Sequence, residues 1–160
     1  MNIFCASKRL LTLDFKFIYF LKKALKIAIY SGDIPSTTFI ERLIQGLANT
    51  GNNIYLFGFK KEKMSYKGSV SVFAYKNTKP HKALHYLTYS FLLFCFKPKE
   101  KQKLDAILKA QSKNLLLAKV KCYPVLWHKP DVFHMQWAKG LEDWMWVKDF
   151  GIKLVEITLI

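Results

Sequence analysis

The loop 32–36 carries polar residues at a position where α/β proteins often bind ligands. It follows the apolar run 25–30, which predicts a buried strand, and it precedes an amphipathic helix. Open α/β sheets bind ligands at the carboxyl ends of their strands, and the free amides of a helix amino terminus attract anions. The candidate binding residues here are Gly32, Asp33, Ser36 and Thr37.

A second polar stretch accompanies the short apolar segment 132–134. His134 supplies an imidazole, which can transfer protons near neutral pH. Gln136 and Trp137 supply an amide and an indole, which could hydrogen-bond to a ligand and stack on it. We expect the segment 132–134 to be the fourth strand of a parallel sheet, with its carboxyl end adjacent to that of the first strand.

Each of these features also has a purely structural explanation. The loop 32–36 could be a plain tight turn, and backbone groups could satisfy the hydrogen bonds of His134. Trp137, Trp144 and Trp146 could all serve core packing, because tryptophan buries a large apolar area. The sequence alone leaves both explanations open at each position.

The sequence lacks the residue patterns of several other kinds of site. The Gly-x-Gly-x-x-Gly of dinucleotide sites and the Gly-x-Ser-x-Gly of hydrolases are absent. His81 and His85 are spaced to share a helix face, but no third ligand lies nearby in the sequence, so we expect no metal site. Cys5, Cys95 and Cys122 are odd in number and widely spaced, which indicates free thiols in a reducing compartment.

Alternating strands and helices are expected to position the two polar stretches. Further strands are predicted at 54–59, 69–75, 132–134 and 152–160. Thr38 and Glu41 fit a capping box that starts the first helix, and Gly51 ends it. The predicted fold class is α/β, a Rossmann-like, mostly parallel sheet flanked by helices.

The remaining helices are predicted from apolar spacing and prolines. They should span 80–96, about 100–118 and 137–148, with Pro124 closing the second region. The helix 80–96 has large apolar side chains on all sides, so we expect it to be buried beneath a solvated basic face. Its uncharged run 83–96 has 14 residues, whereas a membrane span takes roughly 17–25. No transmembrane helix is therefore predicted.

Length and charge narrow the class of protein. The chain has 160 residues, which suits one domain, and its 51% hydrophobic content excludes intrinsic disorder. It carries 26 Lys and Arg residues against 11 Asp and Glu, a formal charge of +15. Only Arg9 and Arg42 are arginines, and lysine is a hydrated point charge rather than a forked donor. The excess therefore favours diffuse attraction to anions over specific recognition of nucleic acid.

A set of short motifs occurs in a recognisable order. The loop 32–36 leads into Ser36-Thr37-Thr38-Phe39-Ile40, Gly51 precedes the second strand, and Pro130-Asp131-Val132-Phe133-His134 forms the fourth strand. Over about 25–155, this order resembles the amino-terminal domain of GT-B glycosyltransferases of the large retaining family 4. Two positions depart from the family pattern: Asn52 replaces a histidine after Gly51, and Gln136 stands where a second histidine is often found.

The resemblance implies an enzyme that transfers a sugar with retention from a nucleotide-sugar to a glycan or lipid-linked acceptor. The domain 25–160 would be its acceptor side, incomplete at its carboxyl-terminal end, and residues 1–24 would be an extension outside the resemblance. His134 would be the catalytic residue facing the reacting sugar, and the two polar stretches would contact the acceptor. The donor would bind mainly to a missing carboxyl-terminal domain, so this chain alone is expected to be inactive.

A basic module without chemistry is the alternative function. The lysines of 97–121 lie near the aromatic run 86–96 and could attract an anionic membrane or nucleic acid. A flavodoxin-like or receiver domain is a third candidate, but the acidic cluster that a receiver needs after its first strand is absent.

Asp14 and Lys16 interrupt the apolar part of a candidate signal peptide. We therefore expect a cytoplasmic protein, with peripheral contact at the inner face of the membrane as a second expectation.

Overall fold

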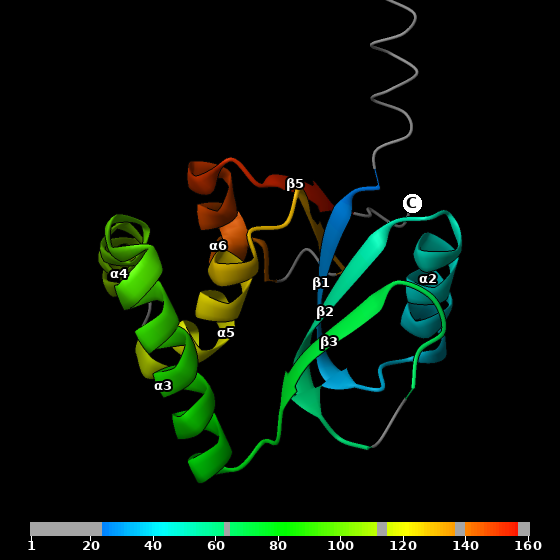
Figure 1. Cartoon of the computed structure of the whole chain (residues 1–160), viewed down its shortest axis with the longest axis horizontal. Coiled ribbons are helices and arrows are strands. Elements are labelled where there is room, and N and C mark those ends of the chain that lie inside the picture. Colours follow the sequence, from blue (N-terminus) through cyan, green and yellow to red (C-terminus); the bar gives the residue numbers. More distant parts are fainter. Residues whose placement is uncertain (1–23, 63–64, 112–114, 137–139, 157–160) are drawn as a thin grey trace, which may run out of the picture.

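The chain folds around a sheet of five parallel strands in the order β3-β2-β1-β4-β5. A computed structural model describes residues 24–62, 65–111, 115–136 and 140–156 (Figure 1). The strands are β1 (Lys26–Ile34), β2 (Asn53–Lys60), β3 (Val70–Tyr75), β4 (Val132–Met135) and β5 (Lys153–Glu156). The helices are α2 (Thr38–Asn49), α3 (Lys79–Phe96), α4 (Pro98–Gln111), α5 (Leu115–His128), α6 (Leu141–Trp144) and the 3-10 helix η2 (Met145–Phe150). The predicted α/β, Rossmann-like class is confirmed.

Two buried clusters cover opposite faces of the sheet. On one face, Ile27 and Ile29 of β1 belong to the same cluster as Ile40 and Ile44 of α2. On the other, Ala28 of β1 belongs to a larger cluster, whose other members come mainly from β2, β4, α3, α4, α5, α6 and η2. Figure 1 shows α2 alone on one side of the sheet and the other helices on the opposite side. Strand alternation therefore sends successive β1 side chains into different layers.

The start of α2 differs from the predicted capping box. Thr37, rather than Thr38, is the N-cap, and its side chain makes no capping hydrogen bond. Glu41 instead accepts hydrogen bonds from the Ser36 backbone N–H at 2.6 Å and from the Tyr66 hydroxyl at 3.1 Å. The predicted reciprocal cap was wrong. Because the cap lies one residue earlier, the Glu41 carboxylate reaches back to the preceding loop and fixes it to the helix.

The helices after α3 also end at different places from those predicted. The helix α5 continues through Pro124 to His128, so the prediction that Pro124 closes this region was wrong. An internal proline costs roughly 3 kcal/mol, but the residues from Tyr123 to Leu126 are all buried, and this packing outweighs the lost backbone hydrogen bond.

The predicted helix 137–148 is only partly α-helical. Residues 137–139 lie outside the described ranges, and the rest is the short α6 followed by η2. Trp144, Val147 and Phe150 recur every third residue and all join the larger cluster. A spacing of three matches the 3-10 period, so the turn tightens to bury all three side chains.

The prediction that α3 is buried was wrong for its outer side. Leu93 is buried and Tyr86 and Tyr89 pack against the larger cluster. Large apolar side chains on the other side are 61–71% exposed, namely Leu84, Leu87, Phe91, Phe94 and Phe96. None of the helices within the described ranges has the length and apolar character of a membrane span.

Candidate functional site

The carboxyl ends of β1 and β4 lie next to each other at a topological switch point. β1 pairs with β2 on one side and with β4 on the other, all parallel. The connection from β1 to β2 passes through α2 on one face, whereas the connection from β4 to β5 passes through α6 and η2 on the other. Such a reversal opens a crevice at the carboxyl edge where open α/β sheets bind ligands. The predicted adjacency of the first and fourth strands is confirmed.

The first polar stretch is partly strand rather than loop. β1 continues to Ile34, so Gly32 and Asp33 are strand residues, paired with Gly58 and Phe59 of β2. The pairing shifts register between Tyr30 and Gly32, and Gly32 has a positive φ of 71°. A Cβ added at Gly58 would lie 2.5 Å from the Gly32 carbonyl oxygen. This close backbone approach requires glycine at position 58 and shapes the end of β1.

Side-chain and backbone hydrogen bonds hold the segment that follows. The Ser31 hydroxyl donates to the Asp33 carbonyl oxygen at 2.9 Å, and the Ser36 backbone N–H donates to Glu41. Asp33 and Thr37 are exposed, and Ser36 is half-buried. The Asp33 carboxylate lies 3.7 Å from Lys61 Nζ, and both side chains are more than half exposed, so this ion pair contributes little. The carboxylate of Asp33 and the hydroxyl of Thr37 are therefore accessible at the rim.

His134 is buried within the sheet. It is in register with Ile29 of β1 and is 7% exposed. Val132 packs against the α2-side cluster while Phe133 belongs to the other, so alternation places His134 on the α2 side. Its Nδ1 atom makes no hydrogen bond to another described residue. Burial lowers its pKa, and its own backbone partly offsets that effect, so the imidazole is neutral near pH 7.

Gln136 lies closer to the carboxyl edge than His134 does. It directly follows Met135, the last residue of β4. Its Nε2 atom is buried and has no hydrogen-bond partner among the described residues. A buried amide without a partner is costly, and a polar ligand or water at the edge would satisfy it. Trp137, the third predicted residue of this stretch, lies outside the described ranges.

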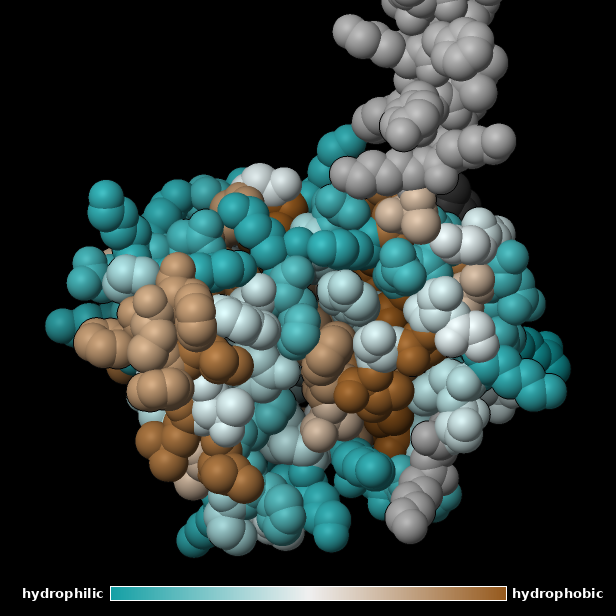
Figure 2. Space-filling model, viewed as in Figure 1, coloured by the Kyte–Doolittle hydropathy of each residue, from teal (hydrophilic) through white to brown (hydrophobic). Residues whose placement is uncertain are grey.

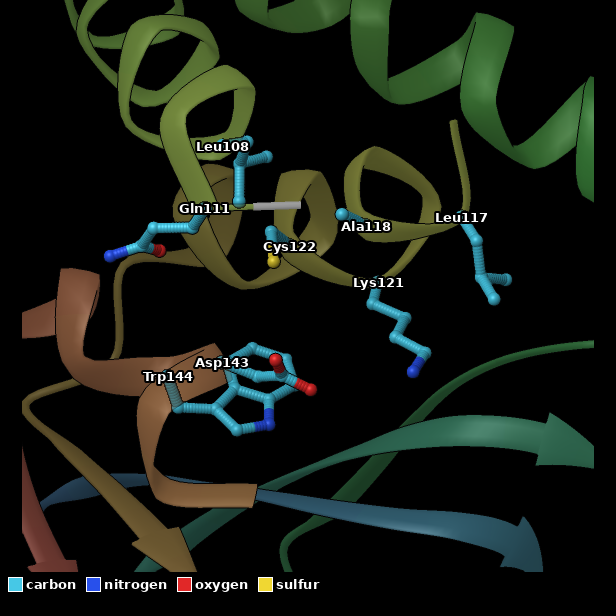
Figure 3. Close-up of a pocket in the computed structure, with 8 residues that line it drawn as sticks. All are labelled: Leu108, Gln111, Leu117, Ala118, Lys121, Cys122, Asp143 and Trp144. Carbon is cyan, nitrogen blue, oxygen red and sulfur yellow. The ribbon is translucent and has the colours of Figure 1, made fainter. Parts of the chain in front are cut away.

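A small cavity on the other face also borders these strand ends. Its volume is about 130 Å³ and it is lined by residues from α4, α5 and α6, namely Leu108, Gln111, Leu117, Ala118, Lys121, Cys122, Asp143 and Trp144. Figure 3 shows Lys121 and Asp143 projecting from different helices into the same space above the strands. The Trp144 ring lies 4.4 Å from Phe133 of β4 and 5.1 Å from Tyr30 of β1, between ring centroids.

The cavity offers binding groups rather than a nucleophile. An ammonium group, a carboxylate and an amide line it, and such groups can donate to and accept from hydroxyl groups. Burial raises the pKa of the Cys122 thiol to about 12, so this cysteine is a protonated, weak nucleophile near neutral pH. No sequence pattern predicts this cavity, because its residues come together only when three helices pack over the sheet.

A half-buried aromatic and histidine cluster between α3 and the sheet is structural. The Tyr89 hydroxyl lies 3.2 Å from His128 Nε2, and the His85 ring lies 4.4 Å from the Tyr75 ring. Burial lowers the pKa of both His85 and His128 to about 4, and a positive Lys97 contributes at His128. Burial also raises the pKa of Tyr75 and of Tyr89 to about 12. All four side chains are therefore neutral at physiological pH.

The described residues contain no group of three or more His, Cys, Asp or Glu side chains that could hold a metal ion. His81 is exposed and its Nδ1 lies 2.7 Å from the Thr78 hydroxyl, whereas His85 packs against Tyr75. The two histidines therefore have different surroundings despite their spacing.

Searches of known protein families, characterised proteins and solved structures give no match to this chain.

Proposed function

We propose that this chain is the acceptor-side domain of a retaining GT-B glycosyltransferase that acts on a glycan or lipid-linked acceptor. The observation that carries the proposal is the position of the two polar stretches beside the switch point between β1 and β4. Two of the motifs that resemble family 4, Ser36–Ile40 and Pro130–His134, overlap these two segments. A crevice at a switch point is where a small polar substrate binds in open α/β sheets.

The chemistry of the edge suits a carbohydrate. Asp33 and Thr37 are exposed at the end of β1 and the start of α2, and Gln136 has an amide nitrogen without a partner. Hydroxyl groups of a sugar both donate and accept hydrogen bonds, so they can pair with a carboxylate, a hydroxyl and an amide. The Lys121–Asp143 cavity adds charged partners on the other face of the same strands.

The residues of this chain would orient the acceptor and would not form a covalent intermediate. In transfer with retention, the acceptor hydroxyl oxygen forms a bond to the anomeric carbon on the face from which the phosphate departs, and the hydroxyl proton leaves with the phosphate. Holding that hydroxyl in place lowers the entropic part of the barrier. In this proposal, His134 is a neutral hydrogen-bonding group near the reacting sugar, and the nucleotide-sugar is bound mainly by a second domain outside these residues.

Saturation-transfer NMR tests the proposal with defined probes. Octyl glucoside, octyl galactoside and octyl mannoside, kept below their critical micelle concentrations, represent the acceptor, and UDP-glucose and GDP-mannose represent the donor. We expect at least one octyl glycoside to bind, and Gln136→Ala or Asp33→Asn to weaken its binding about three- to tenfold through the lost hydrogen bond. The nucleotide-sugars should give little signal.

Asp149→Asn is the matched control, because Asp149 is also an exposed aspartate but belongs to η2. It should leave glycoside binding unchanged. Binding of nucleotide-sugars alone, or glycoside binding that none of the edge variants alters, would contradict the proposal. Strongly salt-dependent binding to DNA without any glycoside binding would favour the alternative, a basic module without chemistry.

A further inference from the structure

The outer side of α3 is an apolar surface that no other described element covers. Five of its side chains, which we call the α3 stripe, are 61–71% exposed: Leu84, Leu87, Phe91, Phe94 and Phe96. The first four recur at intervals of three and four residues, so they share one side of the helix. Figure 2 shows hydrophobic side chains gathered over this part of the molecule. A patch of this kind on a folded domain marks an interaction surface.

A neighbouring groove extends this surface toward the carboxyl edge of the sheet. It has a volume of about 440 Å³ and is lined by Lys79, Lys82, Ala83, Leu116, Leu117 and Val120, from the starts of α3 and α5. Leu116 at its border is 59% exposed. Because α3 begins after the carboxyl end of β3, the groove and the proposed acceptor crevice belong to the same edge of the sheet.

The charges around α3 favour a negatively charged binding partner for this surface. Every charged residue between Glu62 and Glu100 is a lysine, so α3 itself carries no carboxylate. Lys76 and Lys79 are exposed at its amino-terminal end, and Lys99 is exposed just beyond its carboxyl-terminal end. Leucine and phenylalanine flanked by lysine is the composition of surfaces that insert apolar side chains between lipids while ammonium groups contact anionic headgroups.

A second copy of the chain fits this surface less well. A symmetric pairing through α3 would bring the like-charged lysines of the two copies together, with no carboxylate on either helix to offset them. An anionic bilayer instead offers negative charge and hydrocarbon at the same surface. We propose that the α3 stripe and its flanking lysines dock this domain on an anionic lipid bilayer.

This docking would place the acceptor crevice near the membrane, but it does not rest on the proposed glycosyltransferase function. Vesicle binding and glycoside binding are separate measurements on separate residues. The failure of either proposal can therefore be recognised without the other.

Sedimentation with vesicles tests the proposal on the full chain. The probes are vesicles of phosphatidylcholine alone and vesicles containing about one third phosphatidylglycerol. We expect binding to the anionic vesicles, weakened at least about tenfold by Phe91→Glu, because a charge in the stripe opposes insertion. High salt should weaken the binding further, because it screens the lysines. Phe39→Glu is the matched control, since Phe39 is 53% exposed on α2, on the opposite face of the sheet.

The outcomes separate the possible occupants of the stripe. Vesicle binding that is lost in Phe91→Glu and kept in Phe39→Glu supports the proposal, provided that circular dichroism shows both variants folded. Equal binding by the wild type and Phe91→Glu overturns it. A wild-type dimer that dissociates in Phe91→Glu, measured by light scattering, also overturns it, because the stripe would then cover a second copy.

Cys95 gives a direct readout of insertion. It is an exposed cysteine on α3, next to Phe94 and Phe96, whereas Cys122 is buried. In a Cys5→Ser background, an environment-sensitive fluorophore on Cys95 should shift to shorter wavelength when anionic vesicles are added. An unchanged emission spectrum with vesicle-bound protein would show that another surface makes the contact, and would contradict the proposal.

Discussion

At the residue scale, burial determines which titratable side chains can do chemistry. His134, His85 and His128 all have lowered pKa values because the protein removes them from water. Cys122 is held protonated for the same reason. Asp33 and Thr37, by contrast, remain exposed at the end of β1 and the start of α2. The exposed polar groups at the rim can therefore meet a ligand directly, His85 and His128 serve structure, and His134 can act only as a neutral hydrogen-bonding group.

The half-buried His85 and His128 predict a definite pH dependence of stability. The folded-state pKa of His85 and of His128 is about 4, below the ordinary value of 6.5. Between these two values the unfolded chain therefore binds more protons than the folded chain. The contribution of the neutral histidines to the free energy of unfolding is fully present above pH 6.5 and is lost as pH falls toward 4. Urea unfolding should give a lower free energy of unfolding at pH 5 than at pH 7. Imidazole NMR titration should place both pKa values well below 6.5.

His128→Gln provides the comparison for this prediction. The variant removes one of the two half-buried imidazoles, so its loss of stability between pH 7 and pH 5 should be smaller than that of the wild type. Stability that is flat over this range in the wild type, or both imidazoles titrating near 6.5, would contradict the assignment.

At the element scale, the close approach of β1 and β2 at Gly32 and Gly58 shapes the end of β1. A Cβ at position 58 would meet a backbone carbonyl oxygen, which cannot rotate away as a side chain can. Gly58→Ala should therefore destabilise the fold by roughly 1–3 kcal/mol, with the Gly32 segment displaced. Thermal or urea unfolding measures the loss.

Gly46→Ala is the control for that substitution. Gly46 lies inside α2, and a Cβ there would meet no atom within 4 Å. Alanine is favoured over glycine in a helix interior, so this variant should gain about 0.5–1 kcal/mol. If both alanine variants were equally tolerated, the proposed constraint between β1 and β2 would be absent.

Local sequence patterns predicted which strands and helices exist better than they predicted where helices end or which sides of them are covered. The strands of the parallel sheet and the helix α2 follow from apolar runs and turn residues, and the structure contains them. The position of Pro124 within α5 and the 3-10 turn at η2 could not be predicted, because tertiary packing overrides local preference there. The exposed α3 stripe was missed because apolar residues on all sides of a helix do not tell which side another element covers.

At the scale of the whole molecule, the strand order places two polar stretches that are far apart in the sequence next to each other. The two predicted polar stretches are about a hundred residues apart, and the order of strands makes them neighbours. The resemblance to the amino-terminal GT-B domain predicts that adjacency, whereas the rules for parallel α/β connections only narrow the possible strand orders. The cavity that includes Lys121 and Asp143 could not be predicted, because it forms only where α4, α5 and α6 pack together. The proposed acceptor site, the polar cavity and the end of the apolar surface thus all belong to the carboxyl edge of the sheet.

The most direct test of this arrangement is an amide chemical-shift titration of the full chain with the octyl glycosides. If the switch point between β1 and β4 is the acceptor site, the largest shift changes should fall on residues 31–37 and 134–136, with smaller changes around Lys121 and Asp143. Changes confined to the exposed side of α3, or to the carboxyl-terminal end of α2, would contradict the account, because the ligand would then bind away from the strand ends that define the crevice.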